Sequence, residues 1–118
     1  MLKTELSSYV SGEETVITAT VTNTGYDEAA GSIAVYNEDG SLYQIVCDDI
    51  DTLASGEVYT YSFVLDAEYF ENDMYKSVIV GIIPNVEQYT DAYNKASIYL
   101  KNPKEYGEIN PDVVMNAL

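Results

Sequence analysis

Hydrophobic and polar side chains alternate along most of the chain, a period of two that is typical of strands with one buried face. In Thr15–Thr22 the odd positions Ile17, Ala19 and Val21 are apolar and the even positions are mostly threonine. No run of ten or more residues shows helical periodicity, although a short helical turn is expected around Ala67–Phe70. The pattern predicts strands over Leu2–Val10, Thr15–Thr22, Gly31–Asn37, Leu42–Cys47, Val58–Leu65, Lys76–Ile83 and Lys95–Leu100.

Turn residues separate these runs. Asp39-Gly40 lies between two alternating segments and predicts a hairpin, because glycine accepts the positive φ that such turns need. Asn23, Gly25 and Gly56 are expected to occupy turn positions with positive or left-handed φ for the same reason. Lys76–Ile83 is almost continuously apolar, which indicates a central strand buried on both faces.

Seven short strands at a spacing of roughly 8–12 residues favour an all-β fold, an immunoglobulin-like antiparallel β-sandwich of about seven strands. The sandwich is expected to span residues 1–101. Residues 102–118 break the alternation and contain Pro103 and Pro111. They are interpreted as a C-terminal tail or a linker to a further domain.

The charge balance limits the range of partners. The 118 residues include 5 basic and 20 acidic side chains, a formal net charge of −15. Nucleic-acid phosphates and anionic membrane surfaces would be repelled, so neither is expected as a partner. No stretch is apolar for the 18 or more residues that a membrane-spanning helix needs, so membrane insertion is not expected.

Catalysis is not expected from this sequence. The chain has no histidine, which excludes Ser-His-Asp and Cys-His arrangements and histidine-based metal sites. Its single cysteine, Cys47, lies in the apolar run YQIVC and is expected to be a buried small hydrophobe. The glycines are scattered singly, so no phosphate-binding loop is present. We therefore expect a protein that is not an enzyme and has no cofactor.

Calcium is the most serious candidate ligand among metals. Asp48, Asp49 and Asp51 lie within four residues, and calcium prefers clustered carboxylate oxygens. The alternative is an exposed acidic loop without metal, and no tight site is expected.

The chain holds 12 tyrosines, and some of them could stack on a sugar. Tyr59 and Tyr61 share a predicted strand face, and Tyr36 and Tyr43 could meet across the predicted hairpin. Together the four are candidates for a glycan-binding platform. The alternative is that they fill the edge of the core, and the absence of tryptophan, the usual best platform, favours it.

Several short motifs resemble the CARDB-type immunoglobulin-like domains of bacterial and archaeal surface proteins. They are VTNTG at residues 21–25, the turn LASGE at 53–57 before a strand containing Phe63, and the polar corner DAYNKA at 91–96. The resemblance covers about residues 13–100, and Tyr93-Asn94-Lys95 replaces an Asn-Asn pair frequent in the family. It implies a non-catalytic spacer or adhesive unit in a multidomain extracellular protein.

The tail contains a fainter resemblance, to a dockerin-type calcium loop. Glu108, Asn110, Asp112 and Asn116 fall at the ligand offsets 1, 3, 5 and 9. Val113 stands where a glycine normally makes the sharp turn, so the segment as it stands is not a competent calcium loop. The alternative is a linker or a docked terminal segment.

These observations predict a non-catalytic structural or interaction module of a longer, extracellular or cell-surface bacterial protein. Its expected partners are neighbouring domains of the same chain or another protein. The alternative is a carbohydrate-binding module that uses exposed tyrosines, with or without calcium. The carbohydrate-binding alternative can be distinguished in a structure, because it requires tyrosine rings that face solvent.

Overall fold

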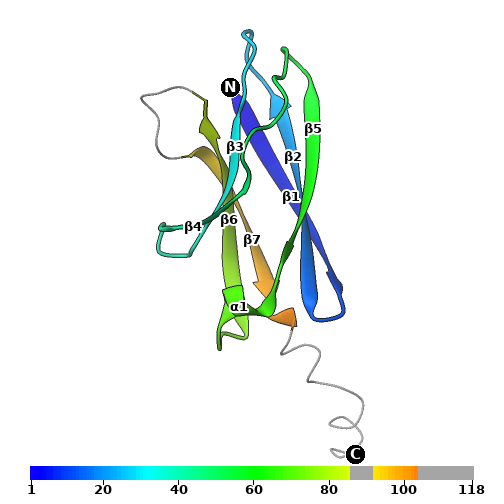
Figure 1. Cartoon of the computed structure of the whole chain (residues 1–118), viewed down its shortest axis with the longest axis vertical. Coiled ribbons are helices and arrows are strands. Elements are labelled where there is room, and N and C mark those ends of the chain that lie inside the picture. Colours follow the sequence, from blue (N-terminus) through cyan, green and yellow to red (C-terminus); the bar gives the residue numbers. More distant parts are fainter. Residues whose placement is uncertain (86–91, 104–118) are drawn as a thin grey trace, which may run out of the picture.

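The computed structural model describes residues 1–85 and 92–103, which form two antiparallel β-sheets packed face to face (Figure 1). One sheet has the strand order β1-β2-β5 and the other β4-β3-β6-β7. The elements are β1 (Leu2–Ser11), β2 (Glu14–Asn23), β3 (Gly31–Tyr36), β4 (Leu42–Cys47), β5 (Val58–Leu65), α1 (Ala67–Phe70), β6 (Tyr75–Pro84) and β7 (Tyr93–Lys101). The predicted immunoglobulin-like sandwich of seven strands is confirmed.

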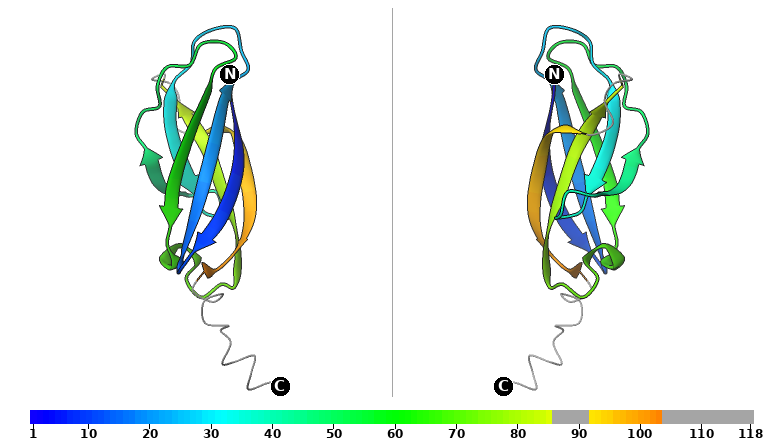
Figure 2. Two further views of the ribbon diagram at one scale, coloured as in Figure 1. Left: turned by 90° about the vertical axis from the view of Figure 1, so that its right-hand side faces the viewer. Right: turned by 90° about the vertical axis from the view of Figure 1, so that its left-hand side faces the viewer.

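The two panels of Figure 2 show the three-stranded sheet and the four-stranded sheet in turn, each from its outer side. β1 and β2 pair without irregularity from Leu2↔Asn23 to Ser11↔Glu14. β5 returns to lie beside β2, and β6 returns to lie beside β3. These two crossings join the sheets into one sandwich, which holds a single core between them.

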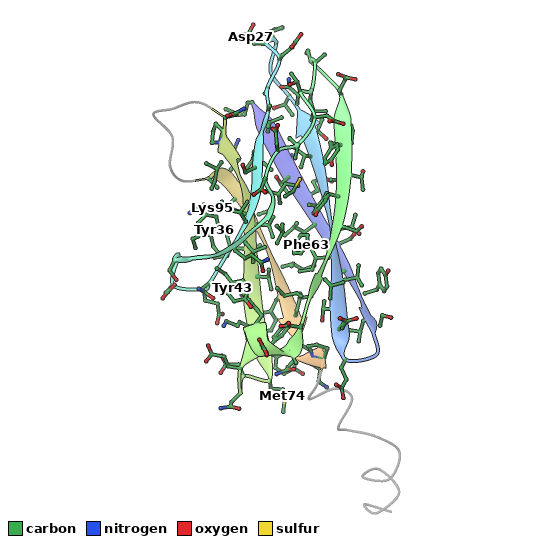
Figure 3. All side chains as sticks on the ribbon, in the orientation of Figure 1. Asp27, Tyr36, Tyr43, Phe63, Met74 and Lys95 are labelled. Atoms are coloured by element: carbon green, nitrogen blue, oxygen red, sulfur yellow. The ribbon has the colours of Figure 1, made fainter. Side chains whose placement is uncertain are left out.

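Alternation along the strands fills that core. In β2 the side chains of Ile17, Ala19 and Val21 are fully buried, whereas Thr18, Thr20 and Thr22 are half-buried on the outer face. Phe63 lies between the sheets (Figure 3). The fully buried apolar residues of the core include Leu2, Ile17, Val21, Ile33, Val35, Ile50, Tyr69, Phe70, Val78, Val80 and Ile82.

β6 is central in its sheet but is buried on one face more than the other. Val78, Val80 and Ile82 face the core, while Ile79 and Ile83 are half-buried on the outer face. The predicted burial of this strand on both faces is therefore wrong. No further layer covers the outer face among the described residues, apart from Ala92 and Lys95, which fold over its middle.

Asn23, the last residue of β2, organises the end of the sandwich that is uppermost in Figure 1, here called the upper end. Its buried side chain donates to the carbonyls of Asp27 and Leu53, both at 2.8 Å, and accepts from Gly25 N at 3.0 Å. Its backbone bonds to Glu57 and Gly56. One asparagine thereby connects the VTNTG segment to the LASGE turn.

The expected glycine and asparagine conformations are only partly observed. Gly40 and Gly56 have φ of +90° and +84°, as predicted for their turns. Asn23 and Gly25 do not have positive φ, so that prediction is wrong. Gly25 is needed for space instead, because a Cβ there would lie 2.5 Å from the Met1 nitrogen. Asn23 acts through its side-chain amide.

At the lower end the sandwich continues past the predicted boundary at residue 101. Asn102 and Pro103, which the sequence pattern assigns to the tail, are buried. Asn102 donates from its backbone to Met74 O at 2.7 Å and from its side chain to Asp73 O at 3.0 Å. The dockerin-like segment, with Glu108, Asn110, Asp112 and Asn116, lies outside the described residues.

Candidate interaction surfaces

The acidic loop after β4 is anchored to the core by Ile50. Ile50 is buried, and its N–H donates to Gly31 O at 2.9 Å. Asp48, Asp49 and Asp51 on either side of it are exposed. Within the described ranges, no group of three His, Cys, Asp or Glu side chains is arranged to hold a metal ion. The loop is thus a negatively charged surface with a buried anchor, Ile50, between its carboxylates.

Cys47, at the end of β4, is half-buried rather than buried as predicted. Its thiol lies 3.7 Å from the carbonyl oxygen of Asp49, a weak hydrogen bond. β4 is an edge strand, so one side of this residue is left uncovered by the sheet. With no histidine in the chain, no imidazole base is available to activate the thiol.

Tyr59 and Tyr61 lie on the inner face of β5. Both are partly buried against the core, and their rings stack with centroids 6.5 Å apart and planes 12° apart. Tyr61 stacks in turn on Phe63 at 6.3 Å and donates its hydroxyl to Val46 O at 2.8 Å, which ties β5 to β4. Burial raises the pKa of Tyr59. This ring column closes one side of the sandwich.

Tyr36 is covered on the outer face of the four-stranded sheet. Only 3% of it is exposed, its hydroxyl accepts from Ala92 N at 3.0 Å, and Lys95 Nζ lies 4.2 Å from the ring centroid. Figure 3 shows Lys95 and Tyr36 side by side. A Cβ at Gly81 would lie 2.9 Å from Lys95 Cγ, so the glycine leaves room for the lysine to cross the sheet.

Tyr43 turns toward the lower end of the molecule. The pairing of β3 with β4 shifts register between Val35 and Tyr36, which leaves Tyr43 as an extra residue opposite β3. Its ring meets that of Tyr69 edge to face at 4.7 Å. Burial raises the pKa of Tyr43. Tyr36 and Tyr43 therefore belong to two different clusters.

Tyr69 and Lys76 form a buried polar pair that the sequence pattern does not single out. The Tyr69 hydroxyl donates to Tyr36 O at 2.9 Å, and Lys76 Nζ donates to Tyr69 O at 2.9 Å while lying 4.5 Å from its ring centroid. Burial, followed by the nearby charge of Glu38, raises the pKa of Tyr69 to about 12. The sequence does contain one signal for this pair, because Lys76 falls on the same strand face as the apolar residues Val78 and Val80.

The exposed parallel tyrosines are a different pair from those predicted. Tyr75 of β6 and Tyr99 of β7 stack with centroids 5.6 Å apart and planes 8° apart. Tyr99 is 67% exposed, Tyr75 46% and the adjacent Met74 45%. Figure 3 places Met74 at the lower end of the molecule. Sequence reasoning missed this pair because their approach depends on the register of β6 with β7.

A hollow lined by acidic side chains lies next to β6 at the same end. It is lined by residues of the β3–β4 turn, the segment after α1 and the start of β6, namely Asn37, Glu38, Asp39, Glu71, Asp73 and Lys76. Glu38 accepts from Ser77 N at 3.2 Å, beyond the point where β3 ends. A hydrogen bond from Ser41 holds the pKa of Asp39 below its usual value.

Comparison with known proteins identifies no family for this chain. No family model matches the chain, and no curated protein matches it. Among solved structures it is similar to Bacteroides uniformis beta-glucuronidase, with 18% identity over 86% of this chain and a TM-score of 0.48. A calcium-binding mutant of Bacteroides uniformis beta-glucuronidase 2 gives 19% identity at the same coverage and TM-score. The chain spans 13% of each of these proteins.

No helix in residues 1–85 and 92–103 is long and apolar enough to cross a membrane.

Proposed function

We propose that the chain is a non-catalytic structural and interaction module, a spacer or adhesive unit of a multidomain bacterial extracellular or cell-surface protein. The observation that supports this most is the position of the strand ends. β1 begins at the upper end of the sandwich and β7 ends at the lower end (Figure 1). Neighbouring domains attached at these two points would extend along the long axis without crossing either sheet.

The CARDB-like motifs support the same role. In the CARDB-type domains these motifs form turns. Here the buried side-chain amide of Asn23 connects the two corresponding segments, VTNTG and LASGE. That arrangement stabilises the end of a domain. The extracellular location is part of the proposal and depends on this resemblance.

Glycan binding, the alternative, has less support from the predicted tyrosines. Tyr36 is covered by Lys95, and Tyr59 and Tyr61 pack against the core. Tyr43 is partly exposed, with its ring edge-to-face on Tyr69. A sugar platform normally needs an open ring face.

The proposal is tested with the full chain on a glycan array and against a panel of chromogenic glycosides. We expect no turnover and no reproducible micromolar glycan binding. Binding that is lost in Tyr59→Ala or Tyr61→Ala, and retained in the control Tyr26→Ala, would establish a carbohydrate-binding module instead. Tyr26 is a suitable control because it is 99% exposed on a loop.

A further inference from the structure

The exposed residues Met74, Tyr75 and Tyr99, here called the tyrosine ledge, form an apolar surface on the outer side of β6 and β7. The ledge is built on paired strands rather than on a loop. Tyr75 is opposite Lys101 and Ser77 is opposite Tyr99, so the two rings lie diagonally across adjacent strands. Their parallel stacking holds both rings in place before any partner arrives.

Stacking on each other leaves much of these rings in water. Tyr99 is still two-thirds exposed, at 67%, although Tyr75 covers one side of it. Rigid, exposed aromatic rings are the residues that most often dominate protein–protein interfaces, because they bury a large area at little entropic cost. Among the described residues, two other tyrosines are strongly exposed, namely Tyr26 on a loop at 99% and Tyr9 on β1 at 61%.

The charge next to the ledge selects the partner. Four carboxylates, those of Glu38, Asp39, Glu71 and Asp73, line the hollow on the other side of β6. Lys76, which also lines this hollow, is buried, and its ammonium group donates a hydrogen bond to Tyr69 O. Lys101 of β7 is opposite Tyr75, at the ledge. The field at the hollow is therefore dominated by carboxylates.

The hollow and the ledge lie on either side of Ser77 in β6, close enough for one partner segment to contact both. Ser77 is bonded to the Glu38 carboxylate at 3.2 Å on one side of β6 and is opposite Tyr99 on the other. Adjacent strands are roughly 5 Å apart, so the carboxylate and the ring are separated by about two strand spacings. A partner can contact both at once.

We propose that the tyrosine ledge, with the adjacent carboxylates, binds an arginine-bearing segment of a partner protein, an inference that rests on the proposed role as an interaction module. Guanidinium is the cation that fits both features, because it stacks on aromatic faces and binds carboxylates through two parallel hydrogen bonds. A second copy of this chain would be repelled by a net charge of −15, as would a phosphate-bearing ligand.

The test is an NMR titration of the full-length, isotope-labelled chain with a hexa-arginine peptide, using hexa-lysine and maltohexaose for comparison. We expect shifts concentrated at the hollow and the ledge, at residues 37–39, 71–77 and 97–101, with hexa-lysine weaker than hexa-arginine. Tyr99→Ala should weaken binding by about ten-fold or more. Tyr99→Phe, which keeps the ring, should bind normally, and so should Tyr26→Ala.

The carboxylates are tested in the same titration. The double variant Glu71→Gln/Asp73→Asn should weaken hexa-arginine binding, whereas Asp27→Asn, at the opposite, upper end of the molecule (Figure 3), should not. Shifts spread evenly over all acidic loops, or no effect of Tyr99→Ala, would overturn the ledge while leaving the spacer function standing. Equal binding of hexa-lysine would overturn stacking as the basis of selection. Maltohexaose bound at the ledge would overturn both proposals in favour of glycan binding.

Discussion

Asn23 performs several structural tasks with one side chain. Its amide nitrogen donates to two carbonyls, and its amide oxygen accepts from Gly25 N. Because the residue is completely buried, water cannot replace any of these partners. The sequence motif around it is therefore explained by hydrogen bonding at the upper end of the fold.

Asn23→Asp keeps the shape of the side chain and removes both amide donors. One oxygen of the new carboxylate would face the carbonyls of Asp27 and Leu53. The Met1 ammonium, which donates to the other oxygen at 3.3 Å, offsets part of this repulsion, and the free energy of unfolding should still fall by about 2 kcal/mol. Urea unfolding monitored by tyrosine fluorescence measures the change. Asn37→Asp is the matched control, because Asn37 bonds to Ser41 at the surface and should cost little. Equal losses in the two variants would contradict the assigned role.

Thr15 presents the opposite case, a buried hydroxyl without a partner. Its Oγ1 is inaccessible to water and makes no hydrogen bond. The same is true of Thr4 Oγ1. Thr15→Val should therefore raise the free energy of unfolding, by about 1 kcal/mol, because a methyl group replaces an unsatisfied polar atom at the same volume. Thr18→Val should give no such gain, since Thr18 shares a hydrogen bond with Ser62 at 2.9 Å. A loss of stability in Thr15→Val would show that its hydroxyl is satisfied in solution.

Tyr69 predicts a stability loss at alkaline pH. Its folded-state pKa of about 12 lies above the ordinary value of 10.0, so the unfolded chain releases this proton first as the pH rises. The contribution of Tyr69 is complete below pH 10 and is lost between about pH 10 and pH 12. Urea midpoints across this range should decline less in Tyr69→Phe than in the parent chain. Parallel declines would exclude a raised Tyr69 pKa.

At the scale of elements, the strands follow directly from the alternation of side chains. Seven strands, the Asp39-Gly40 hairpin and the short helix could all be predicted, because each depends on neighbours in the chain. Contacts that depend on register could not. The approach of Tyr75 to Tyr99, the covering of Tyr36 by Lys95 and the turning of Tyr43 toward Tyr69 all involve irregular or diagonal pairing.

The end of β7 makes a prediction about truncation. A chain that stops after Pro103 keeps the Asn102 hydrogen bonds to Met74 and Asp73, and should melt close to the temperature of the full chain. A chain that stops after Lys101 loses both bonds and the burial of Asn102, and should melt several degrees lower. Differential scanning calorimetry compares the two. A large loss already in the chain that stops after Pro103 would show that residues 104–118 contribute to the fold.

At the scale of the whole molecule, the two ends of the sandwich have different organisation. The upper end is closed by the backbone and amide bonds of Asn23, and the lower end by the Tyr69–Lys76 pair and Asn102. The tyrosine ledge lies near the lower end, where β7 leaves the sandwich. A spacer with this layout would carry its binding surface beside one of its two connections.

The most direct test of the spacer role is small-angle X-ray scattering from two copies of the full chain joined in tandem, compared with one copy. Because the strand ends lie at opposite ends of the sandwich, the tandem protein should be elongated, with a maximum dimension roughly twice that of the single copy. High salt should change this little if geometry rather than charge repulsion keeps the copies apart. A tandem protein with a maximum dimension close to that of one copy, its two sandwiches packed side by side, would contradict the account.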